Sequence, residues 1–434
     1  MIFGIDTYSS RFAIIADDGT RLTYGELAER VAARAKELQK GVLQFCLCRN
    51  SIESIVAYLA CLEAGAPVVL LDATKDPETI ENLRKIYKPG ETKCHPDLAL
   101  CLTTSGSTGS PKLVRLTKRN ILANAESIAE YLQIDENERP ITMLPMYYSY
   151  GLSIINSHLI KGATILLTDK TYAQREFWNF LCENEATSMA GVPYTWEMLR
   201  RLRFFRMDLP SVKTLTQAGG KLNTEIAREY IENAQQTGRQ FIVMYGQTEA
   251  TARMSYLPWE HAAEKASSVG IAIPGGRFEV VDADGNIIQT PNEDGELIYY
   301  GDNVSMGYAE CAKDLLRGDD NHGRLATGDI ARCDEDGFYY ITGRKKRFVK
   351  IWGNRCNLDQ IEQLAKTITT SCACVGVDDL VTIFTTARGV EQDIKQLLTT
   401  KTGLNSRAFS VREIDAIPVS ESGKLDYRAM QDML

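Results

Sequence analysis

Short β-rich runs alternate with helical patterns over the first half of this 434-residue chain. The helical pattern at 22–39 opens on Thr23, and Glu26 follows three residues later at the spacing of a capping box. β-rich runs separated by helical or loop sequence occupy residues 44–48, 67–71, 141–145, 163–167, 212–217 and 240–245. Strands that alternate with helices form βαβ units with parallel strands. We therefore expect an α/β protein whose large N-terminal domain contains two mostly parallel α/β sheets.

The pattern changes after about residue 270. The runs VDADGN at 281–286 and CDEDGF at 333–338 are Asp-Gly turns between apolar segments, which predict antiparallel hairpins and a smaller antiparallel β region. A basic run, GRKKRFVK at 343–350, precedes a tail with its own helix and strand patterns. We expect two domains, residues 1–345 and a small α+β domain over residues 346–434.

Composition narrows the class of function. The net charge is −8, which argues against a general role at nucleic acids or at anionic membrane surfaces. No apolar run approaches the roughly 18 residues that span a bilayer. The start, MIFGIDTYSSRF, lacks the basic and apolar regions of a signal peptide. We expect a cytoplasmic protein with no membrane span and no nucleic-acid partner.

Eleven cysteines are scattered along the chain. Cys46/Cys48 and Cys372/Cys374 form C-x-C pairs inside apolar runs, where we expect a strand to point the two thiols of a pair apart. No histidine stands at a metal-ligand spacing from them. These features predict reduced, buried thiols rather than a metal site.

The segment TTSGSTGSPK at 103–112 is too polar and too small to pack a core. Glycine permits positive φ, successive backbone N–H groups form an anion-binding nest, and hydroxyl groups add donors. With the charge of Lys112, the segment is typical of a phosphate-binding loop. It fits neither the P-loop pattern, because Lys112 follows Pro111 and precedes Leu113, nor the spacing of a dinucleotide fingerprint. A plain surface turn is the alternative.

This loop resembles the phosphate-loop signature of the AMP-forming acyl-adenylate synthetases, the superfamily of acyl-CoA ligases, adenylation domains and luciferase. Further segments resemble the family's motifs in the family's order, and the pattern is most similar to the acyl-CoA ligase branch. They are RLTYGEL (21–27), TQAGGKL (216–222), YGQTEAT (245–251), GELIYYGDNVSMGY (295–308), RLATGDIARCDEDGFYYITGR (324–344), VKIWGNRCNLDQIE (349–362) and SESGKLDYRAM (420–430).

The resemblance implies an ATP site. Residues of the loop would hold the β- and γ-phosphates, assisted by Thr103 and Lys112; they are Thr104, Ser105, Gly106, Ser107, Thr108 and Gly109. Thr248 would contact phosphate, and Glu249 would position Mg²⁺, a hard cation that takes oxygen ligands. The adenine would lie against Gly219, Gly220, Tyr245 and Gly246.

Two further nucleotide contacts are implied near the domain junction. Asp329 in TGD would accept the ribose hydroxyl groups, and Arg344 in ITGR would make a second contact.

The resemblance also implies a catalytic cation on a mobile C-terminal domain. Lys424 in ESGKLDY would stabilise the charge that builds when a carboxylate attacks the α-phosphate of ATP. The domain would then rotate about Arg347, and the thiol acceptor would pass Gly353.

The segment LPMYYSYGL at 144–152 resembles the acyl-pocket segment of the CoA ligases, and Tyr148, Ser149, Tyr150 and Gly151 would line the substrate pocket. It lacks the aspartate that pairs an α-ammonium group, so an α-amino acid is disfavoured as substrate. The tyrosines favour an aryl or medium apolar acid.

The resemblance implies an acceptor thiol that belongs either to CoA or to the phosphopantetheine of an acyl carrier protein. A nucleotide-binding protein without chemistry is the third alternative. Four positions depart from the family pattern: Leu113, Lys118, Tyr148 and Arg347. None of these departures removes the phosphate loop, Glu249, Asp329 or Lys424.

Overall fold

The computed structural model describes residues 1–103, 112–345, 347–352, 354–419 and 425–434. Several predicted site residues lie outside these ranges: Thr104, Ser105, Gly106, Ser107, Thr108, Gly109, Gly353 and Lys424.

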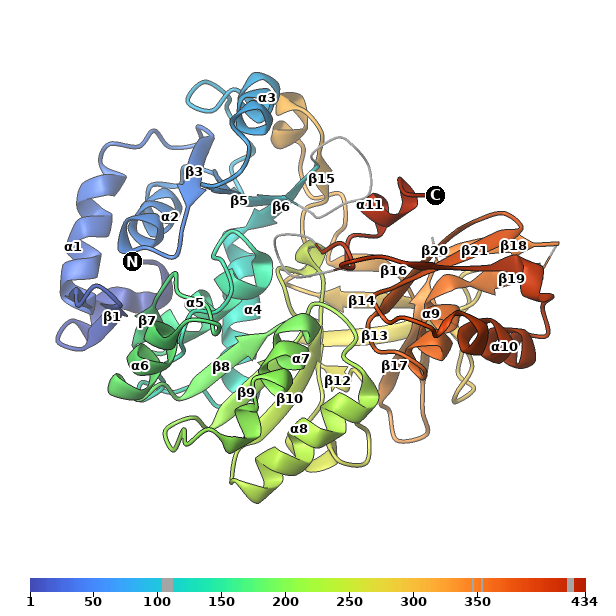
Figure 1. Ribbon diagram of the computed structural model, residues 1–434. Coiled ribbons are helices and arrows are strands. Elements are labelled where there is room, and N and C mark those ends of the chain that lie inside the picture. Colours follow the sequence, from blue (N-terminus) through green and yellow to red (C-terminus); the bar gives the residue numbers. More distant parts are fainter. Residues whose placement is uncertain (104–111, 346, 353, 420–424) are drawn as a thin grey trace.

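The first large sheet has the strand order β15-β6-β5-β4-β3. Its strands are β3 (Gln44–Cys48), β4 (Val68–Asp72), β5 (Leu98–Thr103), β6 (Leu113–Thr117) and β15 (Tyr308–Ala309). Strands β3, β4 and β5 are parallel, whereas β6 and β15 pair antiparallel. Nearby helices are α2 (Ile52–Ala64), α3 (Pro77–Tyr87) and α4 (Lys118–Tyr131) (Figure 1).

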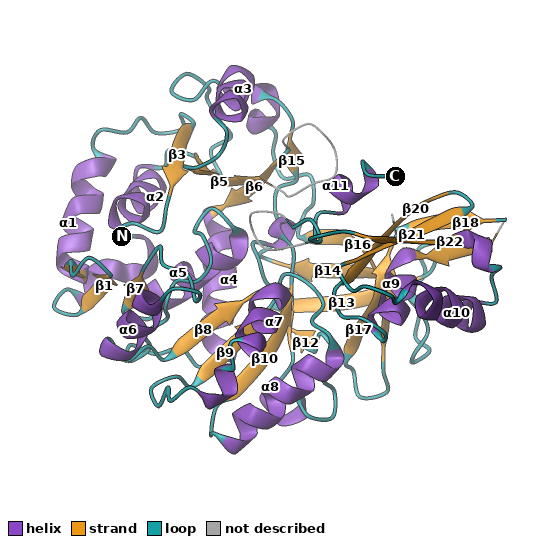
Figure 2. Cartoon of the chain, in the orientation of Figure 1, coloured by secondary structure: helices purple, strands orange, loops and turns teal. Residues whose placement is uncertain are grey.

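The second large sheet has the order β12-β11-β10-β9-β8. Its strands are β8 (Ser188–Gly191), β9 (Thr214–Gln217), β10 (Gln240–Tyr245), β11 (Ser255–Tyr256) and β12 (Ile271–Ala272). Strands β8, β9 and β10 are parallel, and β11 and β12 are antiparallel. The helices are α5 (Ser149–Leu159), α6 (Arg175–Glu183), α7 (Pro193–Arg201) and α8 (Thr224–Gln236); α7 and α8 contact β8 and β10 (Figure 2).

The sheets are therefore mixed, and the prediction of mostly parallel sheets holds only for three strands in each. The physical reason is connection length. A parallel crossover needs a dozen or more residues, usually including a helix. The connections 104–112 and 246–254 are shorter, so β5 and β10 must each be followed by an antiparallel strand.

A third, small sheet joins β1 (Phe12–Ala16), β2 (Arg21–Thr23) and β7 (Ile165–Leu167). Helix α1 (Tyr24–Ala35) follows, and its predicted capping box is confirmed. The Thr23 hydroxyl accepts from the Glu26 N–H at 3.2 Å, and the Thr23 N–H donates to the Glu26 carboxylate at 2.8 Å.

The predicted antiparallel region is the sheet β13-β14-β16-β17, formed by Gly276–Val281, Gly295–Gly301, Arg324–Cys333 and Tyr339–Arg344. The Asp-Gly turns lie at its hairpins, where Gly285 and Gly337 have φ of 87° and 83°.

The C-terminal part follows in order as β18 (Phe348–Ile351), β19 (Asn354–Asn357), α9 (Leu358–Lys366), β20 (Cys372–Val377), β21 (Leu380–Thr385), α10 (Glu391–Thr402), β22 (Phe409–Glu413) and α11 (Tyr427–Gln431). It buries a core of its own that includes Ile361, Ile383, Leu398 and Phe409. Figure 2 shows α9, α10 and β20–β22 gathered beside the antiparallel sheet. Short 3-10 helices lie at Ile2–Tyr8, Phe204–Arg206, Thr248–Ala250, Trp259–His261, Ala312–Leu316 and Ser406–Ala408.

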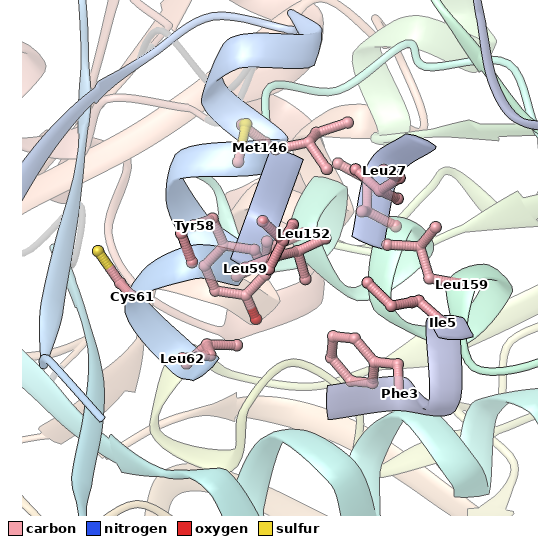
Figure 3. Packing of buried hydrophobic residues seen from close by; sticks show 14 of the residues in the cluster. Phe3, Ile5, Leu27, Tyr58, Leu59, Cys61, Leu62, Met146, Leu152 and Leu159 are labelled. Atoms are coloured by element: carbon pink, nitrogen blue, oxygen red, sulfur yellow. The ribbon is translucent and has the colours of Figure 1, made fainter. Parts of the chain in front are cut away.

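The largest apolar core fixes the helix that carries the predicted substrate segment. Leu152 and Leu159 of α5 pack with Leu59 of α2 and with Phe3 near the N-terminus (Figure 3). The buried Tyr58 hydroxyl donates to Asn156 of α5 at 3.2 Å. Because α5 is held along its length, the position of its N-terminal residues is determined by this core.

All eleven cysteines are free thiols. The expectation that a strand separates the thiols of a C-x-C pair is wrong for Cys46 and Cys48, whose sulfur atoms lie 3.5 Å apart. Successive residues alternate between the two faces of a strand, so residues two positions apart share a face. The described residues contain no group of three potential metal ligands, and none of the helices they form is long and apolar enough to cross a bilayer.

His158, on α5, makes the stability of this core depend on pH. Its Nδ1–H donates to the carbonyl of Ile154 at 2.7 Å, and burial lowers the pKa of the imidazole from 6.5 to about 4. In the unfolded chain, the His158 imidazole therefore becomes protonated as the pH falls below 6.5. In the folded chain it becomes protonated only as the pH approaches 4.

We expect the His158 contribution to be fully present above pH 6.5 and to be lost as the pH falls toward 4, by about 3 kcal/mol. In His158→Asn, the amide keeps a donor for Ile154 without titrating. The free energy of unfolding of this variant, measured at pH 7 and pH 4.5, should fall less than that of the natural protein. An equal fall in both proteins would contradict the assignment.

Candidate active site

The site forms where the end of β10 meets the antiparallel sheet. The Tyr245 hydroxyl donates to Asp329 Oδ2 at 2.5 Å, and Gln247 Nε2 donates to the same oxygen at 2.9 Å. Arg344 Nε lies 3.3 Å from Asp329 Oδ1, because Asp329 on β16 is paired in register with Arg344 on β17. Asp329 is 4% exposed, so this carboxylate is a buried acceptor surrounded by donors.

The structure therefore brings together three predicted nucleotide contacts, Tyr245, Asp329 and Arg344. Burial raises the pKa of Tyr245, and the charge of Asp329 raises it further, so the phenol stays a donor. The sequence interpretation missed Gln247, which also donates to the carbonyl of Thr327 at 2.9 Å. Its position inside YGQTE was the signal.

Glu249 is connected through Tyr308 to the strand that follows the predicted phosphate loop. Its Oε1 accepts from the Tyr308 hydroxyl at 2.6 Å, and Tyr308 is in β15, which pairs with β6 directly after the loop. Lys112, the last residue of the predicted loop, is ion-paired with Glu310 at 2.6 Å and has its ammonium 5.8 Å from the Tyr308 ring centroid. Burial raises the pKa of Tyr308, and the Glu249 carboxylate adds to this shift.

Glu249 fits Mg²⁺ only as a single protein carboxylate. Among the residues described, Glu249 belongs to no group of three or more acidic, histidine or cysteine side chains that could hold a metal ion. Mg²⁺ commonly keeps several waters and is held by one or two carboxylates together with substrate phosphates. The donor set suits that kind of site.

Hydroxyl groups connect the nucleotide segment to the substrate segment. Thr248 Oγ1 lies 3.2 Å from Ser149 Oγ at the start of α5. Tyr148 precedes the helix as its N-cap residue, and its ring centroid is 6.3 Å from that of Tyr150. The predicted substrate residues thus lie next to the residue predicted to contact phosphate.

Two of the predicted substrate residues also have structural roles. The Tyr150 hydroxyl donates to the Thr216 carbonyl at 2.9 Å. Gly151 lies against the preceding loop, where a Cβ would meet the carbonyl oxygen of Pro145 at 2.3 Å.

The glycines predicted to lie against the adenine have structural roles as well. Gly219 has φ of 88°, and Gly220 follows it at the end of β9. The Gly220 carbonyl accepts from Gln217 Nε2 at 2.9 Å. Gly246 is a packing requirement, because a Cβ there would lie 1.7 Å from the carbonyl oxygen of Ala252.

Arg347 is held by the C-terminal part of the chain. It is ion-paired with Asp359 at 2.9 Å and with Glu362 at 3.3 Å, and its guanidinium lies 3.6 Å from the Tyr427 ring centroid. Glu362 is 3% exposed and also pairs with Lys366 at 2.8 Å. The sequence interpretation missed this charged cluster.

Comparison with known proteins identifies the family. The model of the AMP-binding enzymes matches residues 5–85 and 82–309, more than half of the chain. Feruloyl-CoA synthase of Amycolatopsis is 26% identical, covering 94% of this chain and 93% of the relative. A 2-succinylbenzoate–CoA ligase of Bacillus licheniformis is 27% identical, covering 85% and 84%.

Solved structures agree in fold. ATP-bound MatB from Rhodopseudomonas palustris has a TM-score of 0.82 at 21% identity and covers 98% of this chain and 95% of its own. The acyl-adenylate complex of MenE from Bacillus subtilis has a TM-score of 0.78, also at 21% identity, with coverage of 97% and 96%. The chain belongs to the AMP-binding enzymes, the AMP-forming acyl-adenylate synthetase superfamily that its motifs resemble, and it is an AMP-forming ligase.

Proposed function

We propose that this protein activates a small or medium carboxylic acid, not an α-amino acid, as its acyl-AMP and then transfers the acyl group to the thiol of CoA. The observation that carries the proposal is the buried Asp329 carboxylate, surrounded by Tyr245, Gln247 and Arg344. A carboxylate has about four acceptor positions, so Asp329 retains capacity for the hydroxyl groups of a ribose. The curated relatives named as CoA ligases support CoA as the acceptor.

In the first step, a carboxylate oxygen of the acid attacks the α-phosphorus of ATP, and the bond to the β,γ-pyrophosphate breaks. The loop residues 104–109 would hold the departing phosphates, and Lys112 would add positive charge at the end of the loop. Glu249 would hold Mg²⁺, which neutralises phosphate charge when bound. Thr248, next to Ser149, would orient the α-phosphate against the acid.

In the second step, the acceptor thiolate attacks the acyl carbon and AMP leaves. We propose that residues 346–434 form a domain that first brings Lys424 to the α-phosphate and then rotates, so that the thiol enters past Gly353. The rotation would take place around Arg347, which is anchored to Asp359 and Glu362 on the moving side. The whole reaction would take place in the cytoplasm.

A carboxylate screen read by pyrophosphate release, with and without CoA, tests the proposal. CoA-dependent formation of a thioester would support CoA as the acceptor. Pyrophosphate release followed by transfer only to a phosphopantetheinylated carrier protein would support the alternative acceptor. ATP binding without pyrophosphate release from any acid would reject catalysis.

Asp329→Asn should raise the KM for ATP by about 10- to 100-fold, because charge-assisted bonds to the ribose are lost. The natural protein should discriminate against 2′- and 3′-deoxy-ATP, and the variant should discriminate less. Asp336→Asn is the matched control, since Asp336 is an exposed carboxylate paired with Lys265. Unchanged discrimination in Asp329→Asn would place the ribose elsewhere.

Lys424→Ala should lower the rate of pyrophosphate release by at least about 100-fold, because one preorganised charge at the transition state contributes this much. ATP affinity, measured by calorimetry, should change by less than about threefold. Lys401→Ala, an exposed lysine in the last turn of α10, is the control. A variant of Lys424 that keeps the natural rate would remove the lysine from the mechanism.

A further inference from the structure

Arg253 is a buried cation without an acidic partner in the part of the chain that the structure describes. The residue is 3% exposed, its Nε has no hydrogen-bond partner, and no carboxylate lies within 4.0 Å of its nitrogen atoms among the described residues. Arg115, which is fully buried, is different: it pairs with Asp320 at 2.5 Å and donates to the Met306 carbonyl at 2.6 Å. A buried charge without a counter-charge is costly.

The backbone around Arg253 is held in an unusual conformation. Thr251 and Ala252 have φ of 61° and 135°, in the region that favours glycine. The Arg253 carbonyl accepts from the side-chain amides of Asn124 at 3.0 Å and Asn303 at 2.8 Å. Backbone strain of this kind persists where the surroundings over-determine it, and it concentrates at functional sites. The surroundings therefore fix the backbone from which the Arg253 side chain projects.

Neutral aromatic groups surround the guanidinium. Its Cζ lies 3.8 Å from the ring centroid of Tyr150. Burial raises the pKa of Tyr148 and of Tyr150 to about 12, and the charge of Arg253 opposes both shifts. The pKa of Tyr131 is raised by burial and lowered by the charge of Arg253 in the same way, and its hydroxyl donates to Met244 Sδ at 3.0 Å. Cation–π contacts and phenols stabilise a cation in part, but they do not neutralise it.

The same side chain lines a cavity of about 30 Å³ between α5 and the strands β8 and β9. Its polar lining includes Ser153, Ser157 and Thr216. Glu138 is the acidic residue of the lining, but its Oε2 accepts from the Thr187 hydroxyl and it forms no ion pair with Arg253. A site for one water needs roughly 10–15 Å³ of such space, so the cavity suits a small end group rather than a long chain.

The cavity adjoins the predicted acyl site through Tyr150. Tyr150 follows Ser149, whose hydroxyl meets Thr248, and its ring covers the Arg253 guanidinium. An acid whose reacting carboxylate lies at Thr248 would direct its other end past Tyr150 toward Arg253. From the sequence, the tyrosines of this segment favour an aryl or apolar acid. In the structure, the ring of Tyr150 lies against the charged guanidinium of Arg253.

We propose that Arg253 binds a second carboxylate at the far end of the acid, and that the enzyme therefore activates a small dicarboxylic acid. This inference rests on the function proposed above. The arginine determines specificity: it forms an ion pair with the distal group, while the chemistry takes place at the other carboxylate.

Matched acids test this specificity. Pyrophosphate release should be measured for malonate against propionate, succinate against butyrate, glutarate against valerate, and terephthalate against 4-methylbenzoate. In at least one pair, the natural protein should prefer the diacid by roughly 30-fold or more in kcat/KM. Arg253→Met should reduce that preference to within about threefold, because it no longer offers a charge to the distal carboxylate.

The outcomes separate the two proposals. Equal or better use of the monoacids by the natural protein, or a preference that survives in Arg253→Met, overturns the dicarboxylate inference while acid activation still stands. Failure of every acid to release pyrophosphate overturns both.

Melting temperatures distinguish specificity from a structural role. Without ligands, Arg253→Met should melt at or above the temperature of the natural protein, because an uncompensated buried charge is removed. Arg115→Met should melt lower and keep the diacid preference, since Arg115 holds a loop away from this cavity. A large loss of stability in Arg253→Met, with an unchanged ratio of diacid to monoacid use, would assign Arg253 to the fold alone.

Discussion

The buried carboxylate of Asp329 is the interaction on which the arrangement of the site depends. It lies on β16 of the antiparallel sheet, yet two of its donors, Tyr245 and Gln247, belong to the end of β10 in another sheet. A buried charge must be met by donors or by an opposite charge, so the two sheets can pack here only with these groups in contact. The proposed nucleotide site would lie at this junction, where the two sheets bring the donors and Asp329 together.

The parts of this fold that the sequence predicts are those decided by neighbours along the chain. The capping box of Thr23 and Glu26 involves residues three apart, and each Asp-Gly turn is completed within a few residues; in one of them the Asp282 carboxylate accepts from the Asn286 N–H at 2.8 Å. The sequence interpretation missed the mixed character of the sheets in two ways: it did not use the short connections after β5 and β10, and the edge strands depend on long-range pairing. Strand β15, for example, pairs Ala309 with Leu113 across nearly two hundred positions.

The candidate site shows the same division. Motif order indicated Tyr245, Asp329 and Arg344, and the structure places them in contact. Tyr308 and Glu362 close two of the quoted motifs, but the motifs did not reveal what these side chains contact. The partner of Tyr308 is Glu249, and the partners of Glu362 are Arg347 and Lys366. Motif order can indicate a position, whereas the partners of its side chain become evident only in the structure.

The residues at the junction between the two parts of the chain are anchored in opposite directions. Arg344 closes β17 and faces Asp329, whereas Arg347 faces Asp359 and Glu362 on α9. Lys345 is also tied to the antiparallel sheet, through Glu296 at 2.8 Å. The proposed rotation would therefore take place between Lys345 and Arg347.

A polar contact also joins the start of α9 to β17. Asn357 Nδ2 donates to the Thr342 carbonyl at 3.3 Å, and Gly343 lacks the Cβ that would strike the same amide. Polar groups of this kind can exchange their partners for water when the bodies separate, at a small net cost. An apolar seam would instead oppose separation in proportion to its area. If residues 346–434 move as proposed, the contact between Asn357 and Thr342 would therefore add little resistance to the change of position.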